Sequence, residues 1–132
     1  MRHKRRLDFA SPRAILRFMH ELGIATAALD QALEQARLAG AHHVARIGLR
    51  VGVLSGVDPD ALRFAFEAIL PGTAADGAAV DIDPVAAVAH CPDCQRDFAA
   101  ATDYFCECPA CGRVSTTFKQ GRELELTRLE IL

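Results

Sequence analysis

The chain has 132 residues, 51% of them hydrophobic, and its formal net charge at pH 7 is −2. This length fits one domain, or one small domain with a smaller insert, and it supplies a modest core. A charge near zero gives no general attraction to nucleic acid or anionic lipid. No uncharged apolar stretch approaches the roughly 20 residues that span a bilayer, and the basic N-terminus lacks a signal-peptide core, so we expect a cytoplasmic protein.

The first 18 residues are basic at their start and apolar toward their end. Positive charges at Arg2, Lys4, Arg5 and Arg6 are typical of a solvated tail rather than of an arm for nucleic acid or membrane. Ser11-Pro12 is a helix-start signal, and an apolar stripe follows it. The segment is therefore predicted to extend the next helix, if it is ordered.

Two helices and a strand are predicted in the first half of the chain. Apolar residues recur at helical spacing from Leu22 to Ala39, and Gly40 supplies a stop. From Val44 to Leu54 apolar residues alternate with arginine and glycine, which indicates a half-buried strand. Asp58-Pro59 then offers an N-cap and a first-turn proline for a second helix, which Pro71-Gly72 ends.

The next strand and the last strand each carry an irregularity. Residues 78–82 and 85–88 are interrupted by Pro84, which indicates an edge position or a bulge. At the C-terminus, Leu124 and Leu126 alternate in one phase and Leu129 and Ile131 in the other. A bulge is therefore predicted near Thr127 or Arg128.

Four of the five cysteines form two CxxC pairs, Cys91 with Cys94 and Cys108 with Cys111. Each pair lets one tight turn direct two sulfurs at the same ion, and two pairs complete a tetrahedron. We expect zinc; iron in a rubredoxin-like centre would satisfy the same ligands, whereas the odd cysteine count argues against disulfides. A closed four-sulfur shell leaves no open position for a substrate, so the metal is predicted to be structural.

Two further residues of this segment have alternative roles. Cys106 is either a small buried hydrophobe or an exchangeable ligand, and His90 is either a surface histidine or a replacement for one sulfur. The segment contains few large apolar side chains, so it needs the metal in order to fold.

These patterns predict an α+β fold: a small three-stranded antiparallel sheet with two helices on one face, plus an inserted zinc-ribbon module. We divide the chain into an N-terminal extension of doubtful status (1–18), an α/β domain (19–89 and 119–132) and a zinc-ribbon domain (90–118).

Residues 19–132 resemble the hydrogenase nickel metallochaperones of the HypA/HybF family. The resemblance lies in "MHELGIATAAL", "GVLSGVDPDALRFAFEAIL", the two CxxC pairs and "QGRELELTRLEIL" taken together. It implies a nickel carrier, not an enzyme, that works with a HypB-like GTPase to load the hydrogenase large-subunit precursor. In some bacteria such carriers also serve urease accessory proteins. Neither a membrane nor a nucleic-acid partner is expected.

The resemblance also implies that the α/β domain (19–89 and 119–132) is the nickel-binding one, and where in it nickel binds. Family members begin with Met-His-Glu and hold nickel there, which corresponds to Met19, His20 and Glu21. A free amine, the amide after it and the imidazole of the second residue form adjacent chelate rings around a square-planar ion, a geometry that suits Ni(II). Asp58 matches the acidic residue of a family "S-x-x-D" and is an oxygen ligand, a partner contact or simply a helix N-cap.

The extension conflicts with this site because Met19 has no free amine when Phe18 precedes it. Three interpretations stand: the protein starts at Met19, the extension is real and alters nickel binding, or nickel binding is lost. A helix running through residue 19 would also occupy the amides of His20 and Glu21. The rival function is a zinc-ribbon module that binds nucleic acid or protein without nickel, although its basic residues are offset by acidic ones.

Overall fold

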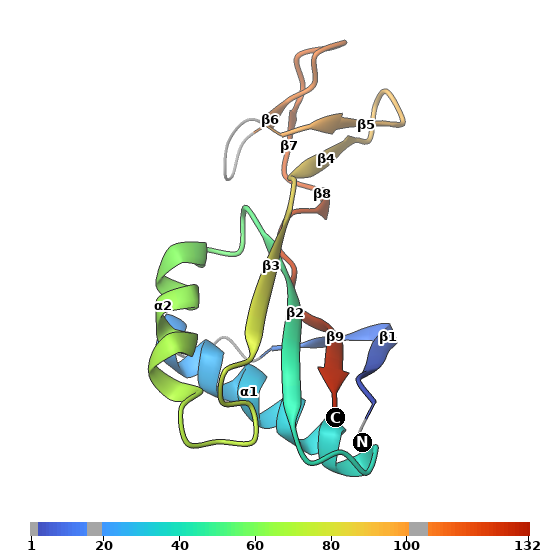
Figure 1. The fold of residues 1–132 in the computed structure, drawn as a ribbon. Helices are drawn as coiled ribbons and strands as arrows, with labels where there is room; N and C mark the ends of the chain where they lie inside the picture. Colours follow the sequence, from blue (N-terminus) through green and yellow to red (C-terminus); the bar gives the residue numbers. More distant parts are fainter. Residues whose placement is uncertain (1–2, 16–19, 101–105) are drawn as a thin grey trace.

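The protein is described by a computed structural model that covers residues 3–15, 20–100 and 106–132 (Figure 1). Its elements in chain order are β1 (Arg5–Ala14), α1 (Glu21–Leu38), β2 (Val44–Gly52), α2 (Pro59–Ile69), β3 (Ala79–Val85), β4 (Val88–Cys91), β5 (Arg96–Ala99), β6 (Cys106–Glu107), β7 (Val114–Ser115), β8 (Phe118–Gln120) and β9 (Leu124–Ile131). A four-stranded sheet with two helices forms one module, and β4 to β8 form a second that stands beyond one end of the sheet.

The strands of the larger sheet lie in the order β1-β9-β2-β3, and one hydrophobic core joins the sheet to both helices. The alternation of apolar and polar residues along β2 explains why the helices pack on one face of the sheet. Ile47, Leu49 and Val51 are buried, while Arg46 and Arg50 lie on the other face. The α+β class, the helices and the inserted cysteine module are thus confirmed.

The sheet differs from the prediction in two ways: it has four strands among the described residues, and its β2–β3 pair is parallel. The predicted sheet was three-stranded and antiparallel. The parallel pair follows from α2, because a helix that crosses over between two strands returns the chain in its original direction. Strand β9 pairs antiparallel with β1 and β2, and β3 is an edge strand, which accommodates Pro84.

The described part of the N-terminal extension forms a strand, β1, rather than a helix, so the predicted helix start at Ser11-Pro12 is wrong. Strand β1 pairs with β9 on both sides of a bulge, with Leu7 opposite Leu129 and Arg13 opposite Leu126. Ile15 continues this pairing by donating its N–H to the carbonyl of Leu124 (2.9 Å). The unpaired backbone groups of the β9 edge offer hydrogen bonds that a solvated tail or helix would leave unmade.

The C-terminal strand contains the predicted bulge. Gly48 of β2 lies opposite Arg128, and the next residue, Leu49, lies opposite Leu126, so Thr127 is the extra residue. Its hydroxyl donates to the carbonyl of Gly48 (3.1 Å). The bulge shifts the phase of β9, so Leu124 and Leu126 before it and Leu129 and Ile131 after it are all buried.

The face of the sheet opposite the helices carries an ion-pair network. Asp81 of β3 accepts hydrogen bonds from Arg46 of β2 (2.8 Å) and Arg128 of β9 (2.7 Å). Arg46 also contacts Glu130, which pairs with Lys4 just before β1. The network therefore links β2, β3 and β9 to one another and to the residue just before β1, across the face opposite the two helices.

The two modules meet where β2 ends and β9 begins. A Cβ atom on Gly52 would lie 2.1 Å from the carbonyl oxygen of Gly121, so only glycine fits there. The same carbonyl accepts the N–H of Leu54 (2.6 Å), and the N–H of Gly52 donates to the carbonyl of Glu123 (2.7 Å). Gly121 has a φ of 121°, a left-handed conformation that glycine adopts without strain.

Replacing Ile15 by alanine tests whether the extension is part of the fold. Ile15 is 4% exposed and packs in the core, so Ile15→Ala should lower the free energy of unfolding by about 2–5 kcal/mol. Urea unfolding measures this change. Leu38→Ala, at a position 63% exposed, is the control and should change stability by less than about 0.5 kcal/mol. Equal, small effects would mean that the extension is not packed.

The Asp81 network predicts a loss of stability in acid. Burial opposes ionisation of this carboxyl, but hydrogen bonds from Arg46 and Arg128 outweigh it and hold the pKa of Asp81 below its usual value. Its contribution to stability is therefore present above the usual pKa of an aspartate and is lost as the pH falls through the lowered pKa. Asp81→Asn should flatten the decline in melting temperature between neutral pH and acid. An unchanged pH profile would contradict the role of the network.

Candidate metal sites

The second module brings the four predicted cysteines together. The Sγ atoms of Cys91, Cys94, Cys108 and Cys111 all lie within 4.8 Å of one another. Two of these separations are 3.7 Å (Cys91 to Cys111) and 3.8 Å (Cys94 to Cys108). A tetrahedron with metal–sulfur bonds of about 2.3 Å has edges of about 3.8 Å, so these two separations match the edges of a zinc site.

Local backbone geometry explains how each CxxC pair aims its sulfurs. The residue after each pair is left-handed, with φ of 53° at Gln95 and 76° at Gly112. The N–H of Gln95 donates to the carbonyl of Cys91 (2.9 Å), and the N–H of Gly112 donates to that of Cys108 (2.8 Å). The N–H of Cys94 also points at the sulfur of Cys91 (3.4 Å). Each turn thus reverses the chain so that its two sulfurs face the sulfurs of the other turn.

An ion pair that the sequence did not reveal joins the two turns. Arg113, just after the second CxxC, donates to Asp93 inside the first at 2.6 Å. This pair holds the pKa of Asp93 below its usual value. A cation beside four thiolates also offsets part of their negative charge. The sequence pattern that could have predicted this ion pair is an acidic residue within one CxxC and a basic residue two positions after the other.

Without metal, the thiols do not ionise alike. Backbone N–H groups of Cys111 and Ala110 lower the pKa of Cys108 to about 7. Hydrogen bonding to the Cys111 and Cys108 side chains raises the pKa of Cys94 to about 12. Since zinc binds thiolates, it must displace the remaining protons, and its affinity should rise with pH.

The two residues of uncertain role lie outside the four-sulfur group. Cys106 is buried in β6, opposite Ser115, as the hydrophobic interpretation expects. His90 uses its Nδ1 atom to contact a carboxylate oxygen of Asp97 (2.7 Å). Its carbonyl accepts a hydrogen bond from the Ser115 hydroxyl (2.5 Å). His90 thus helps to join β4 to neighbouring strands of the ribbon.

The residues proposed for nickel lie at the other module, where the two helices begin. His20 is exposed and is the N-cap of α1, and Glu21 is the first helical residue. The Glu21 carboxylate accepts the N–H of Asp58 (3.2 Å). Asp58 is the N-cap of α2 and accepts the N–H of Asp60 (3.0 Å), so its expected capping role is confirmed.

The nickel residues are only partly assembled. Met19 lies outside the described residues. Glu21 and Asp58 are in contact, but within residues 3–15, 20–100 and 106–132 the cysteines are the only group of three or more such side chains close enough to share an ion. Helix α1 begins at Glu21, so its first N–H groups have no preceding helical carbonyl to bond. The expectation that a continuous helix occupies the amides of His20 and Glu21 is therefore wrong.

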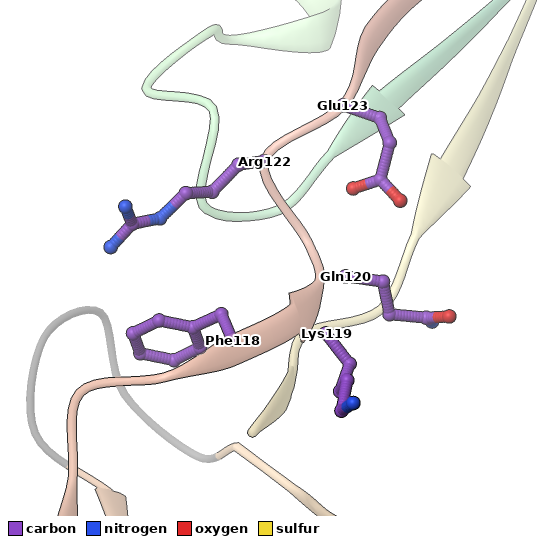
Figure 2. A pocket seen from close by; sticks show the side chains of 5 residues that line it. All are labelled: Phe118, Lys119, Gln120, Arg122 and Glu123. Carbon is purple, nitrogen blue, oxygen red and sulfur yellow. The ribbon is translucent and has the colours of Figure 1, made fainter. Parts of the chain in front are cut away.

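A shallow pocket of about 330 Å³ lies on the linker between the modules, lined by Phe118, Lys119, Gln120, Arg122 and Glu123 (Figure 2). The Arg122 guanidinium stacks 4.9 Å from the Phe118 ring centroid. In Figure 2 these two side chains lie on one side of the linker, whereas Lys119 extends on the other. Glu123 accepts the N–H of Gly121 (2.6 Å) and Gln120 donates to Ala86 (3.0 Å). These contacts mainly hold the linker in place.

A two-helix α+β module joined to a four-cysteine ribbon defines a class of small metal-binding protein. Residues 19–131 match a family model described as "Hydrogenase/urease nickel incorporation, metallochaperone, hypA". The chain belongs to this family. The family is one of metallochaperones rather than catalysts, and this member is a nickel metallochaperone of hydrogenase maturation whose four-cysteine cluster fits structural zinc.

Individual relatives agree with the family match. The chain is 39% identical over 114 residues to the hydrogenase maturation factor HypA of Picosynechococcus sp., which covers 86% of this chain and 100% of the relative. It is 41% identical over 113 residues to that of Aeromonas hydrophila, covering 86% and 99%. The solution structure of the nickel metallochaperone HypA from Helicobacter pylori superposes with a TM-score of 0.63 at 26% identity, covering 86% and 98%. Strand β1 lies outside the family match.

Removing one sulfur tests the zinc site. Cys91 is fully buried and faces Cys111, so Cys91→Ser should abolish retention of one zinc ion per chain and unfold the ribbon. Metal analysis after gel filtration measures the stoichiometry. Cys106→Ser is the matched control, since it removes a buried cysteine outside the group, and it should keep its zinc. Zinc retention by Cys91→Ser, or loss from Cys106→Ser, would contradict the assignment.

Proposed function

We propose that Ni(II) binds where α1 and α2 begin, with His20 as the principal ligand and with Glu21 and Asp58 supplying oxygen atoms. The observation that carries this proposal is the hydrogen bond from the Asp58 N–H to Glu21, because it holds the nickel motif against the N-cap of α2. Imidazole and carboxylate groups suit Ni(II), while thiolates suit zinc, so the two metals would not compete for one site.

The nickel geometry depends on what precedes His20. With residues 1–18 attached, the nitrogen of Met19 is part of a peptide bond and is a poor ligand. Nickel is then held mainly by side chains. A form that begins at Met19 adds an amine and, with it, a chelate of amine, amide and imidazole. Such a chelate favours a square-planar ion and tighter binding.

The partners in this proposal follow the family resemblance. A HypB-like GTPase exchanges nickel with the chain, and the hydrogenase large-subunit precursor receives it, with urease accessory proteins as further recipients in some bacteria. The place of action is the cytoplasm, where the cysteines stay reduced for zinc. Among the described residues, neither helix is long and apolar enough to cross a bilayer. A role in nucleic-acid binding without nickel is not favoured by the family match.

Nickel titration of three forms tests the proposed site. His20→Ala in the full chain should weaken binding by at least about tenfold, because the loss of a metal ligand costs no less than the loss of its hydrogen-bond partner. The form starting at Met19 should bind more tightly than the full chain and show the visible absorption of square-planar nickel. His42→Ala, at an exposed histidine in the turn before β2, is the control and should bind normally. Equal affinity in all forms would refute the site.

A further inference from the structure

Strand β1 covers a sheet edge that would be open without it. The strand order places β9 between β1 and β2, and Figure 1 shows β1 beside β9, on the side away from β2. The family match begins at residue 19, so β1 is not part of it. Without β1, backbone N–H and C=O groups on the outer side of β9 would have no partner in the sheet. Such an edge can take up a strand from another chain.

Contacts at both of its ends fasten β1 to the rest of the chain. At the start, Arg5 donates to the carbonyl of Ala39, the C-cap of α1 (2.9 Å). At the end, Gln31 of α1 donates to the carbonyl of Ala14 (3.0 Å), and the next residue, Ile15, is buried in the core. A strand held at two points along α1 and anchored in the core is a fixed part of the sheet rather than a loose tail.

The outer edge of β1 is itself unsuited to pairing with a further strand. Its register against β9 is broken between Asp8 and Arg13, so residues 9–12 form a bulge. The bulge contains Pro12, which has no N–H to donate. Asp8 and Arg13, on either side of it, are charged and exposed. Bulges, prolines and charges are the features by which natural sheets prevent edge-to-edge association.

We propose that β1 keeps the chain monomeric by blocking a second copy from pairing with it through β9. An antiparallel pair of identical strands is related by a two-fold axis, so an open β9 edge is complementary to itself. Its charges fit such a pair, because Glu125 and Arg128 both lie on the face opposite the helices, where Glu125 contacts Arg50 and Arg128 contacts Asp81. Antiparallel pairing allows Glu125 of each copy to lie opposite Arg128 of the other. This role does not depend on where nickel binds.

The mass in solution of the zinc-loaded full chain, with and without the Ile15 anchor, tests this role. Ile15→Asp places a charge at a buried position, so β1 should detach, and the mass should shift from one chain toward two as the concentration rises. Light scattering measures the mass, and hydrogen exchange within β1 measures its release. Ala10→Asp is the matched control, because it adds the same charge at an exposed position in the bulge and should leave the chain monomeric.

A chain that begins at Met19 lacks β1 altogether and supplies a second test. The family match spans residues 19–131 and one relative is covered over 100% of its length, so this form should fold by itself. It should form dimers in which the β9 amides are protected from exchange. An added peptide of residues 3–15 should return it to monomers by pairing with β9, whereas the same peptide with Ile15→Asp should not.

Three results would overturn the proposal. The first is a folded Met19 form that stays monomeric while its β9 amides exchange freely. The second is a dimer of that form that the peptide of residues 3–15 does not dissociate, since its interface would then lie elsewhere. The third is dimerisation of the unmodified full chain with β1 still paired to β9.

Discussion

The position of the zinc ribbon depends on the close backbone contact between Gly52 and Gly121. The chain passes between the modules twice, before β4 and after β8, and the end of β2 holds both passages. Val53 donates its N–H to Val85 on the first passage, and Leu54 donates to Gly121 on the second. The two segments cannot separate without losing these hydrogen bonds. They also approach so closely that the carbonyl of Gly121 occupies the space that a Cβ atom on Gly52 would need. The loop that makes these contacts continues to Asp58, so the ribbon and the proposed nickel site are joined by one short segment.

The two modules are stabilised by different interactions, which suits two metals with different tasks. The sheet and helices bury a continuous apolar core and need no ion to fold. The ribbon has short strands and four converging sulfurs, so its order depends on the metal. A closed thiolate shell holds its ion permanently, whereas exposed His20 and the carboxylates near it offer oxygen and nitrogen atoms at the surface. A carrier needs the second kind of site because its cargo must be released.

Much of this architecture was predictable because local signals and tertiary packing agree. The N-cap at Asp58, the bulge at Thr127, the edge position of Pro84 and the four-sulfur cluster all follow from short sequence patterns. The parallel β2–β3 pair was missed because strand direction is set by the crossover helix, not by either strand's own sequence. Strand β1 was misread because Ser11-Pro12 resembles a helix start, while the free edge of β9 that it pairs with is visible only in three dimensions. The contact between Glu21 and Asp58 likewise joins residues far apart in sequence.

The central claim is that one chain holds zinc on sulfur and nickel on nitrogen and oxygen, at separate sites. X-ray absorption spectroscopy at both metal edges, on full-length protein loaded with both ions, tests this claim most directly. We expect the zinc edge to show four sulfur neighbours at about 2.3 Å and the nickel edge to show only nitrogen and oxygen neighbours, with the nickel spectrum changed by His20→Ala. Sulfur neighbours around nickel, or a nickel spectrum indifferent to His20→Ala, would contradict it.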